Sequence, residues 1–342
     1  MKKIFAILAV AAAVSASSAM ADVTVFGTMD AGYNSVKAPG ATSATTGFAS
    51  GGMTTSNIGF KGSEDIGGGN KTVFELSSFI NGGTGAVQGG STVNTFARSA
   101  FVGISNGQTG TITLGRQSNP SFLPTILFNA YGDSGTYGPL WHATYFGNTG
   151  NPTTQTFNDT AWDNSIAYTT PSIGGATVSV QQAKGSTAGT NSGANVLYFN
   201  GPVGLTAYWQ KTEFNSSGSF QTDIFTTNGY KPAVAKGIGA SYDAKVAKVF
   251  ATWSEGRDKT TSQDGRTTQV SALIPAGPGS IMAEVARTKY DNGSAFTTYN
   301  EWAVGYDYNL GKKTDVYATI GRTDVSGLAQ GSTVGGGLRV RF

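Results

Sequence analysis

The sequence predicts an all-β fold: a closed, sixteen-stranded antiparallel β-barrel that spans a membrane, with a long third loop folded into its interior. Apolar and polar residues alternate with a period of two in segment after segment, which is typical of strands with one apolar and one polar face. The connections alternate between short turns and longer stretches rich in Gly, Ser, Thr and Asn, and sixteen strands lie between them. The composition, with 49 Gly, 14 Tyr, 19 Phe and no Cys, indicates many strands joined by tight turns.

The first twenty-one residues differ from the rest of the chain and predict a cleaved signal peptide. Lys2 and Lys3 form a positive start, the apolar run 4–14 follows, and 19–21 (AMA) is a small-x-small cleavage site. The alternative, a membrane anchor, conflicts with an apolar run that falls well short of the ~20 residues of a spanning helix. Residues 22–342 are therefore expected to form a single mature barrel domain.

The mature chain is nearly neutral. Without the two lysines of the leader, 21 basic residues face 20 acidic ones, which leaves a formal charge of +1. This charge is too small to indicate binding to nucleic acid or to a charged membrane surface. The mean hydropathy of −0.14 is compatible with a spanning barrel, because only alternate residues of its strands face lipid.

The first three strands show the alternation clearly. In 23–33, 57–66 and 71–80 the outward positions are mostly apolar or aromatic, and the opposite face carries the charged residues Asp30, Lys61 and Glu75. The last three strands repeat the pattern, with Glu301, Asp307, Asp315, Arg339 and Arg341 on the inward face. A soluble β-sandwich would bury one of these faces in its core, where repeated charges are not expected. The charged faces instead favour a water-filled lumen.

The segment 119–162 does not show this alternation of apolar and polar residues. Its apolar and aromatic residues are scattered among Gly, Pro, Asn and Thr without a period of 2 or 3.6. A loop of this length in a compact domain is wrongly assigned, disordered or functional. Disorder is disfavoured because the segment contains many large apolar side chains. We therefore expect it to fold into the barrel and to narrow the lumen as a constriction loop.

At this point the sequence resembles the general porins of the Gram-negative outer membrane, in particular the beta-proteobacterial type. The matching stretches include DVTVFGTMDAGY, IGFKGSEDIGGGNKTVFEL, FARSAFVGISNGQTGTITLGRQ, NSIAYTTPSIGG, EWAVGYDYNLGKKTDVYATIGR and the final GGGLRVRF. The resemblance implies a homotrimer in the outer membrane that lets small hydrophilic solutes and ions diffuse passively. It also implies contact with outer-membrane lipid and lipopolysaccharide, and it identifies Phe342 as the signal for the barrel-assembly machinery.

The family sets basic residues on the barrel wall against acidic residues on the third loop. Arg98, Arg116 and Lys61 match basic wall positions, and the loop offers Asp133 and Asp159 as acids. Three positions depart from the pattern, because relatives often carry a basic residue where this chain has Asn57, Asp163 and Ile166. The resemblance therefore implies only a weak preference for anions.

Two roles remain open for the wall arginines. Arg98 and Arg116 would steer anions through the narrowest cross-section, where low-dielectric walls focus the field. Alternatively, each pairs with a lumen carboxylate such as Glu75 or Asp30 and stiffens the wall. Arg116 has outward parity, so it points inward only if Gly115 interrupts the alternation.

The loop residues also allow two interpretations. Asp133 would form the acidic side of the constriction, or its carboxylate would be satisfied by backbone in an Asx-turn. Tyr131, Trp141 and Tyr145 are expected to pack the loop onto the wall rather than bind a sugar.

The sequence predicts no catalytic residue, no metal site and no cofactor. His142 is the only histidine, and no carboxylate cluster has metal-ligand spacing. The glycine clusters 67–69 and 335–337 precede no helix and so form no phosphate cradle. Two other classes remain as alternatives: a plugged barrel used for adhesion or surface structure, and an outer-membrane hydrolase that depends on His142.

Overall fold

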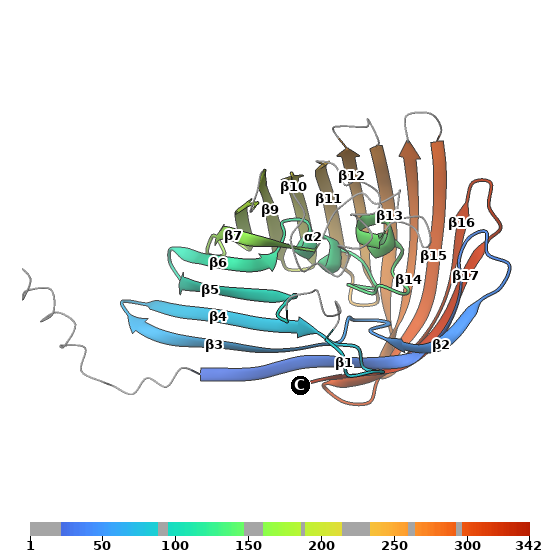
Figure 1. The fold of residues 1–342 in the computed structure, drawn as a ribbon, viewed down its shortest axis with the longest axis horizontal. Helices are drawn as coiled ribbons and strands as arrows, with labels where there is room; N and C mark the ends of the chain where they lie inside the picture. Colours follow the sequence, from blue (N-terminus) through green and yellow to red (C-terminus); the bar gives the residue numbers. More distant parts are fainter. Residues whose placement is uncertain are drawn as a thin grey trace, which may run out of the picture.

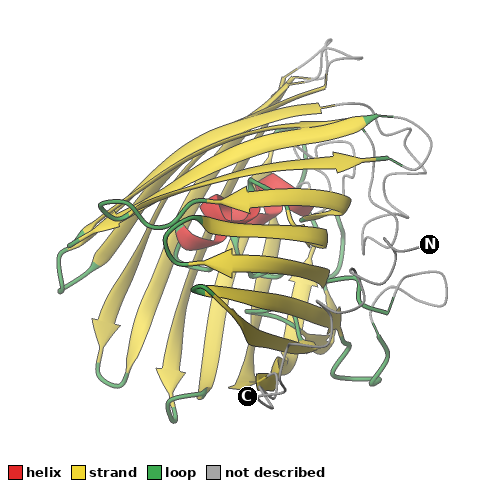
Figure 2. Cartoon of the chain, turned by 90° about the vertical axis from the view of Figure 1, so that its left-hand side faces the viewer, coloured by secondary structure: helices red, strands yellow, loops and turns green. Residues whose placement is uncertain are grey.

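A computed structural model describes residues 22–87, 95–146, 160–185, 189–213, 233–258, 264–291 and 296–342. Seventeen strand segments form one antiparallel sheet, and the first segment pairs with the last, so the sheet closes into a barrel (Figures 1 and 2). The segments of the first half are β1 (Asp22–Lys37), β2 (Thr45–Ser50), β3 (Asn57–Gly67), β4 (Asn70–Phe79), β5 (Ser99–Asn106), β6 (Gly110–Ser118), β7 (Ala161–Thr169) and β8 (Ala176–Lys184). Those of the second half are β9 (Thr190–Asn200), β10 (Val203–Thr212), β11 (Ala233–Asp243), β12 (Lys248–Asp258), β13 (Asp264–Ala276), β14 (Gly279–Asp291), β15 (Phe296–Asn309), β16 (Thr314–Val325) and β17 (Gly331–Arg341).

The barrel has sixteen strands, as predicted, because β2 and β3 are two pieces of one strand. Residues 31–36 of β1 pair with β2, and residues 22–28 of β1 pair with β3. The segment 51–56 leaves the ladder between them. The predicted polar loop at 35–52 was therefore too long: β1 continues to Lys37, and β2 occupies 45–50 on the same edge of β1.

The two faces of the sheet have the predicted character. On β13, β14 and β16 the outward residues Val270, Val285 and Ile320 are each more than half exposed. Their inward neighbours in sequence are polar and buried: Gln269, Glu284 and Thr319. Closure pairs the backbone groups of the first and last strands, as a sheet in lipid requires. Within the described residues, no helix is long and apolar enough to cross a bilayer.

The long segment after β6 folds into the barrel, as predicted. It forms α2 (Phe122–Leu127), α3 (Pro139–Trp141) and the π-helical turn η2 (His142–Phe146), which lie inside the ring of strands (Figure 2). Residues 147–159 of the predicted loop lie outside the described part of the chain.

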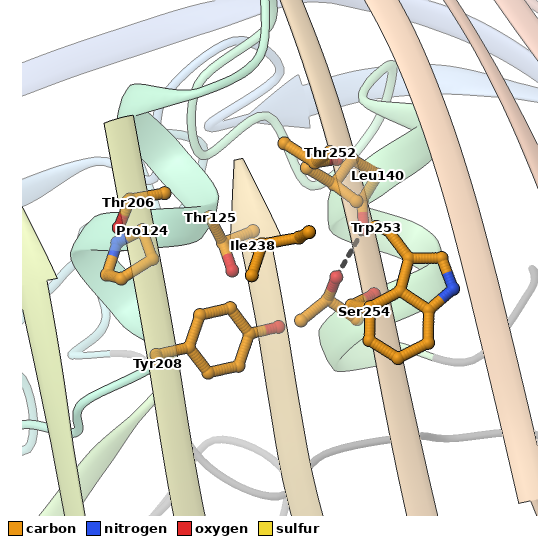
Figure 3. A pocket seen from close by; sticks show the side chains of 10 residues that line it. Pro124, Thr125, Leu140, Thr206, Tyr208, Ile238, Thr252, Trp253 and Ser254 are labelled. Carbon is orange, nitrogen blue, oxygen red and sulfur yellow. Dashed lines mark hydrogen bonds between the residues drawn. The ribbon is translucent and has the colours of Figure 1, made fainter. Parts of the chain in front are cut away.

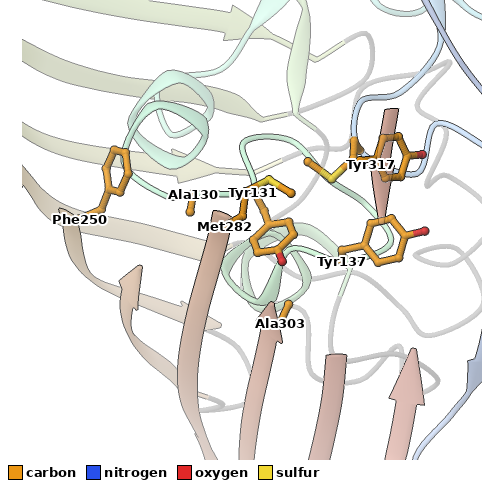
Figure 4. Packing of buried hydrophobic residues seen from close by; sticks show 8 residues of the cluster. Ala130, Tyr131, Tyr137, Phe250, Met282, Ala303 and Tyr317 are labelled. Atoms are coloured by element: carbon orange, nitrogen blue, oxygen red, sulfur yellow. The ribbon is translucent and has the colours of Figure 1, made fainter. Parts of the chain in front are cut away.

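The buried core lies within the lumen, between this loop and one part of the wall. Its largest cluster joins Tyr131 and Tyr137 of the loop to side chains of β12, β14, β15, β16 and the 51–56 segment (Figure 4). The wall members are Met53, Phe250, Met282, Ala303 and Tyr317. The aromatic loop residues thus pack the loop onto the wall, as expected.

Candidate functional site

The part of the loop from Ala130 to His142 is fixed to three adjacent strands. The backbone N–H of Leu140 donates to Oε1 of Glu284 on β14 at 2.7 Å, and the N–H of Ala130 donates to Oγ of Ser271 on β13 at 3.0 Å. On β15, Oε2 of Glu301 lies 3.0 Å from Nδ1 of His142. Inward polar residues of the wall therefore hold backbone and side-chain groups of the loop that would otherwise be buried without a partner.

His142 is buried between the carboxylate of Glu301 and a backbone carbonyl of the loop. Its Nε2 lies 3.1 Å from the carbonyl oxygen of Gly135, and its Nδ1 faces Glu301. Burial lowers the pKa of His142, but the hydrogen bond to Glu301 and the negative charges of Glu301 and Glu284 outweigh burial and raise the pKa above 6.5. The shift favours the protonated imidazole more than in a free histidine, and the contact with Glu301 attaches the loop to β15.

The start of the loop is held by the strands on the other side of β13. The N–H of Ser121 donates to Oε1 of Gln210 on β10 at 3.1 Å, and the side-chain amide of Asn195 on β9 donates to the carbonyl of Pro120 at 2.8 Å. A small cavity remains between α2, α3 and strands β10–β12 (Figure 3). Hydroxyl groups and the ring of Tyr208 line this cavity, so the surface that faces the loop is partly polar.

A third attachment involves Asp30, which sequence analysis placed in the lumen. Asp30 is fully buried, and its Oδ2 accepts from the backbone N–H groups of Met53 and Thr54, both at 2.8 Å. Its Oδ1 accepts from the hydroxyl of Tyr317 at 2.5 Å. The carboxylate therefore secures the 51–56 segment where it leaves the ladder. Ser134 of the loop in turn donates to the carbonyl of Gly52 at 2.7 Å.

Next to Asp30 lies a cluster of charged residues whose contacts with one another were not predicted from the sequence. Arg339 on β17 pairs with Asp315 at 2.9 Å and with Asp307 at 2.8 Å, and it donates to Oγ1 of Thr54 at 2.9 Å. Arg341 pairs with Asp315 at 2.6 Å. The inward parity of these residues was visible in the sequence, and the direct pairing of Asp315 with Arg339 follows from the register of β16 and β17.

Arg98, Glu75 and Lys61 lie together on a different part of the wall. Arg98 directly precedes β5, and its Nη1 lies 3.2 Å from Oε1 of Glu75 on β4; 33% of the arginine side chain and 21% of the glutamate side chain are exposed. Lys61 on β3 is the register partner of Glu75, and its Nζ lies 5.2 Å from the ring centre of Phe26. Lys61 is exposed. Two basic residues thus surround one carboxylate.

Arg116 points inward because the ladder is irregular at Gly115. The register passes from Gly115 opposite Ser165 to Gln117 opposite Trp162, so Arg116 stands against two residues of β7. Gly115 has a φ of 128°, which a side chain would not tolerate. The guanidinium of Arg116 is buried and pairs with Asp163 at 2.8 Å. Asp163, at a position where the resemblance led us to expect a basic residue, is thus the partner of this arginine.

Asp133 stands in a turn of the loop and is half-buried. Burial raises the pKa of Asp133, whereas a backbone N–H, the positive charges of Arg98 and Arg339, and the hydroxyl of Thr54 act in the opposite direction. Burial outweighs these contributions, so the pKa of Asp133 is raised and its charged form is disfavoured. Asp159, the other acid of the loop, is outside the described residues.

No group of three or more His, Asp or Glu side chains in the described ranges could hold a metal ion. Phe342, the C-terminal residue, exchanges two backbone hydrogen bonds with Gly27 at 3.1 and 3.2 Å and so extends the closing pair of strands.

Comparison with known proteins places these features in context. A family described as "Gram-negative porin" matches residues 6–328. Outer membrane porin protein 32 of Delftia acidovorans is 30% identical over 331 residues, covering 94% of this chain and 89% of the relative. An outer membrane porin of Bordetella pertussis is 24% identical over the full length of both chains. Among solved structures, the anion-selective porin from Comamonas acidovorans has a TM-score of 0.75 at 22% identity, covering 94% of this chain and 100% of that chain.

Proposed function

Because the chain belongs to the Gram-negative porin family, we propose that its constriction loop and the facing wall residues set the size limit and charge preference of the channel. The chain is an outer-membrane channel for the passive diffusion of small hydrophilic solutes and ions. Transport through it requires no chemical step. What the geometry adds is where the passage runs and which charges line it.

One observation carries the proposal: the loop is attached to one arc of the barrel and faces another. Its hydrogen bonds reach β9, β10, β13, β14, β15, β1 and the 51–56 segment. Lys61, Glu75 and Arg98 lie on β3, β4 and the start of β5, outside this arc. The passage accordingly runs between the loop and the wall around β3–β8. The charges of Asp133 on the loop and Arg98 on the wall then lie on opposite sides of the passage. The pair of Arg116 and Asp163 stabilises the wall beside it.

The same arrangement supports a weak preference for anions. Arg98 is one-third exposed and Lys61 is exposed, whereas the lumen acids Asp30, Glu301 and Asp315 are buried against their partners. Cations therefore reach the water of the channel more fully than carboxylates do. The fold shared with the anion-selective porin from Comamonas acidovorans supports the same direction. Such a bias tilts permeability without closing the channel to either sign.

The test is a planar-bilayer recording in a salt gradient, with Arg98→Gln compared to Arg322→Gln. The control removes the same charge from an exposed position on β16 that shares the outward parity of Ile320. One unit charge about 6 Å from a permeating ion in water contributes roughly 0.7 kcal/mol, favourable for an anion and unfavourable for a cation, so the anion-to-cation permeability ratio should fall by up to about tenfold in Arg98→Gln. An unchanged reversal potential in Arg98→Gln would contradict the proposed role of Arg98, and the absence of stepwise openings in every variant would contradict the channel itself.

We further propose that the mature chain begins at Asp22, associates as a homotrimer, contacts lipopolysaccharide and is inserted by the barrel-assembly machinery through Phe342. Small outward residues near the termini suit a close subunit contact; Ala31 on β1 is paired with Leu338 on β17. Since the chain contains no Cys, a single cysteine at Ala31 can report this contact. Cross-linking should give bands above the monomer, and a strictly monomeric product at Ala31 would remove this face from the proposed interface.

A further inference from the structure

Two phenylalanines project into the lumen from the wall that faces the loop. Phe101 on β5 lies directly opposite Glu75 on β4, and residues in that position share one face of a sheet. Phe26 on β1 precedes Asp30 by an even number of residues and so points to the same side. The next residue after Phe101, Val102, is 55% exposed on the lipid side. The two rings therefore add nothing to the lipid-facing belt and offer an apolar surface to the channel.

Glycines beside the two rings leave part of their faces uncovered. Gly59 on β3 lies opposite Phe26, and Gly115 on β6 lies opposite Phe101. A Cβ atom at Gly59 would come within 2.8 Å of Cζ of Phe26, so this ring lies over the backbone of β3. Both phenylalanines are half-buried. A solute in the lumen can therefore reach an aromatic ring at this level of the wall.

The charged residues between the two rings carry one net positive charge. The strands β1, β3, β4 and β5 are neighbours (Figure 1), and Lys61 and Glu75 lie opposite each other on the middle pair. Nη1 of Arg98 donates to Oε1 of Glu75 at 3.2 Å and to Oγ of Ser77 at 3.3 Å. Two cations and one carboxylate leave a formal charge of +1. This charge matches a solute with a single negative charge.

Each of the two cations keeps donors for a solute. Among the described residues, the side chain of Arg98 bonds only through Nη1, which leaves the N–H groups of Nε and Nη2. Nζ of Lys61 donates no hydrogen bond to the described part of the chain and lies 5.2 Å from the ring centre of Phe26. A guanidinium with two uncommitted N–H groups on one edge is suited to bidentate binding of a carboxylate.

The spacing of the strands divides the site into two halves. Neighbouring strands lie about 4.8 Å apart, so the row from Phe26 to Phe101 spans three spacings, or about 14 Å. A single aromatic ring is too short to touch both phenylalanines. One half consists of Phe26 and Lys61. The other consists of Phe101 and Arg98, which lie on the same segment, and Glu75 separates the two halves.

We propose that this part of the wall binds monocarboxylates that carry an aromatic ring, in preference to small carboxylates of the same charge. In one half the carboxylate lies on Lys61 and the ring of the solute lies against Phe26. In the other half the carboxylate lies on Arg98 and the ring lies against Phe101. Glu75 positions Arg98 and limits the charge of the site, so a second negative charge on the solute gains less. The proposal rests on the proposed passage along β3–β8 and adds a class of solute to it.

The test measures how benzoate and acetate reduce the single-channel current carried by KCl. The two anions have the same charge, and only benzoate has a ring, so half-maximal block of wild type should need less benzoate than acetate. The variant Phe26→Leu/Phe101→Leu keeps apolar side chains but removes both rings. Its preference for benzoate over acetate should fall roughly 2- to 12-fold, the factor that an aromatic pair contributes beyond its buried area.

The matched control is Phe60→Leu/Phe74→Leu, which removes two rings from β3 and β4. Phe60 is 42% exposed on the lipid side, and Phe74 shares the outward parity of its own strand. This variant should keep the preference of wild type. An equal fall in the control would assign the effect to benzoate dissolved in the bilayer and would overturn the proposal. Stepwise openings with the KCl conductance of wild type show that each variant is folded.

Two further outcomes would overturn the proposal: equal half-blocking concentrations of benzoate and acetate in wild type, and an unchanged preference in Phe26→Leu/Phe101→Leu. Arg98→Gln should weaken the block by both anions, because it removes a charge that both of them use. The reversal potential in a KCl gradient is recorded for each variant and should not change in the phenylalanine variants. A failure of the proposed charge preference thus appears in the reversal potential of Arg98→Gln, whereas a failure of the aromatic site appears in the ratio of benzoate to acetate.

Discussion

The ion pair between His142 and Glu301 should make the attachment of the loop depend on pH. Both side chains are buried, and the loop carries the histidine while β15 carries the glutamate. We choose Glu301→Gln as the perturbation because glutamine keeps the size and one acceptor oxygen but removes the charge. The second carboxylate near the imidazole, Glu284, remains in place and keeps its hydrogen bond from Leu140.

The magnitude follows from the kind of hydrogen bond that is lost. A bond to a charged group contributes about 1.5–3 kcal/mol and a neutral one about 0.5–1.5 kcal/mol, so the variant should lose roughly 1–2 kcal/mol of attachment. The pKa of His142 is raised in the folded state, so this stabilisation is fully present below the ordinary pKa of 6.5. It is lost as the pH rises through the folded-state pKa. Wild type and variant should therefore differ most below pH 6.5 and progressively less as the pH rises through the raised pKa.

The assay uses the absence of cysteine from the chain. Thr144 is 1% exposed, and a cysteine at this position, placed in both wild type and Glu301→Gln, should react with a thiol reagent only when the loop lifts from the wall. The labelling rate of the variant should exceed that of wild type by roughly 5- to 30-fold at pH 6. The ratio should fall as the pH rises through the folded-state pKa of His142, and ionisation of the thiol cancels in the ratio. A ratio that does not change with pH would refute the ion pair as the attachment.

Three further predictions concern the wall and its assembly. Asp30→Asn turns an amide group toward N–H donors of the 51–56 segment and should cost about 1–3 kcal/mol; heat dissociation in detergent should then begin at a lower temperature, and an unchanged temperature would contradict the anchoring role. Gly115→Ala places a methyl group 2.2 Å from a backbone oxygen at a φ of 128° and should lower the folded yield, whereas Gly47→Ala, with open space around it, should not; equal yields would contradict the strained bulge. Phe342→Ala should reduce insertion in cells but leave spontaneous folding into vesicles nearly unchanged, and an equal loss in both assays would make Phe342 a packing residue rather than an assembly signal.

The barrel could be predicted from the sequence because each strand residue faces either lipid or lumen. Apolar and polar residues therefore alternate along each strand. The same parity placed Asp30 and Arg339 inside. The position of Arg116 depended on whether Gly115 interrupts its strand, and the sequence could state only that condition. The extent of the first loop was overestimated because 35–52 is rich in Gly, Ser and Thr, yet its backbone groups complete the ladder of β1.

The partners of the inward residues could not be predicted in the same way. His142 and Glu301 are 159 positions apart, and Asp30 and Tyr317 are 287 apart. Such contacts depend on how the closed barrel sets the height of each strand and where the loop enters. Period and parity specify the face of a residue but not its height relative to a distant strand. The sequence therefore indicated which residues line the lumen and left open which of them are paired.

The attachment of the loop and the ion selectivity of the channel are therefore expected to vary independently. The loop is attached through Glu284, Glu301 and Asp30, whose carboxylates are buried and contribute little field to the water in the lumen. The exposed charge lies on Lys61 and Arg98, which donate no hydrogen bond to the loop residues that the structure describes. A substitution in the first group should therefore change how often the loop moves, and one in the second should change which ions pass. If Arg98→Gln altered labelling at position 144 as strongly as Glu301→Gln does, the two functions would share one network, and the division between an attached arc and an open arc would not hold.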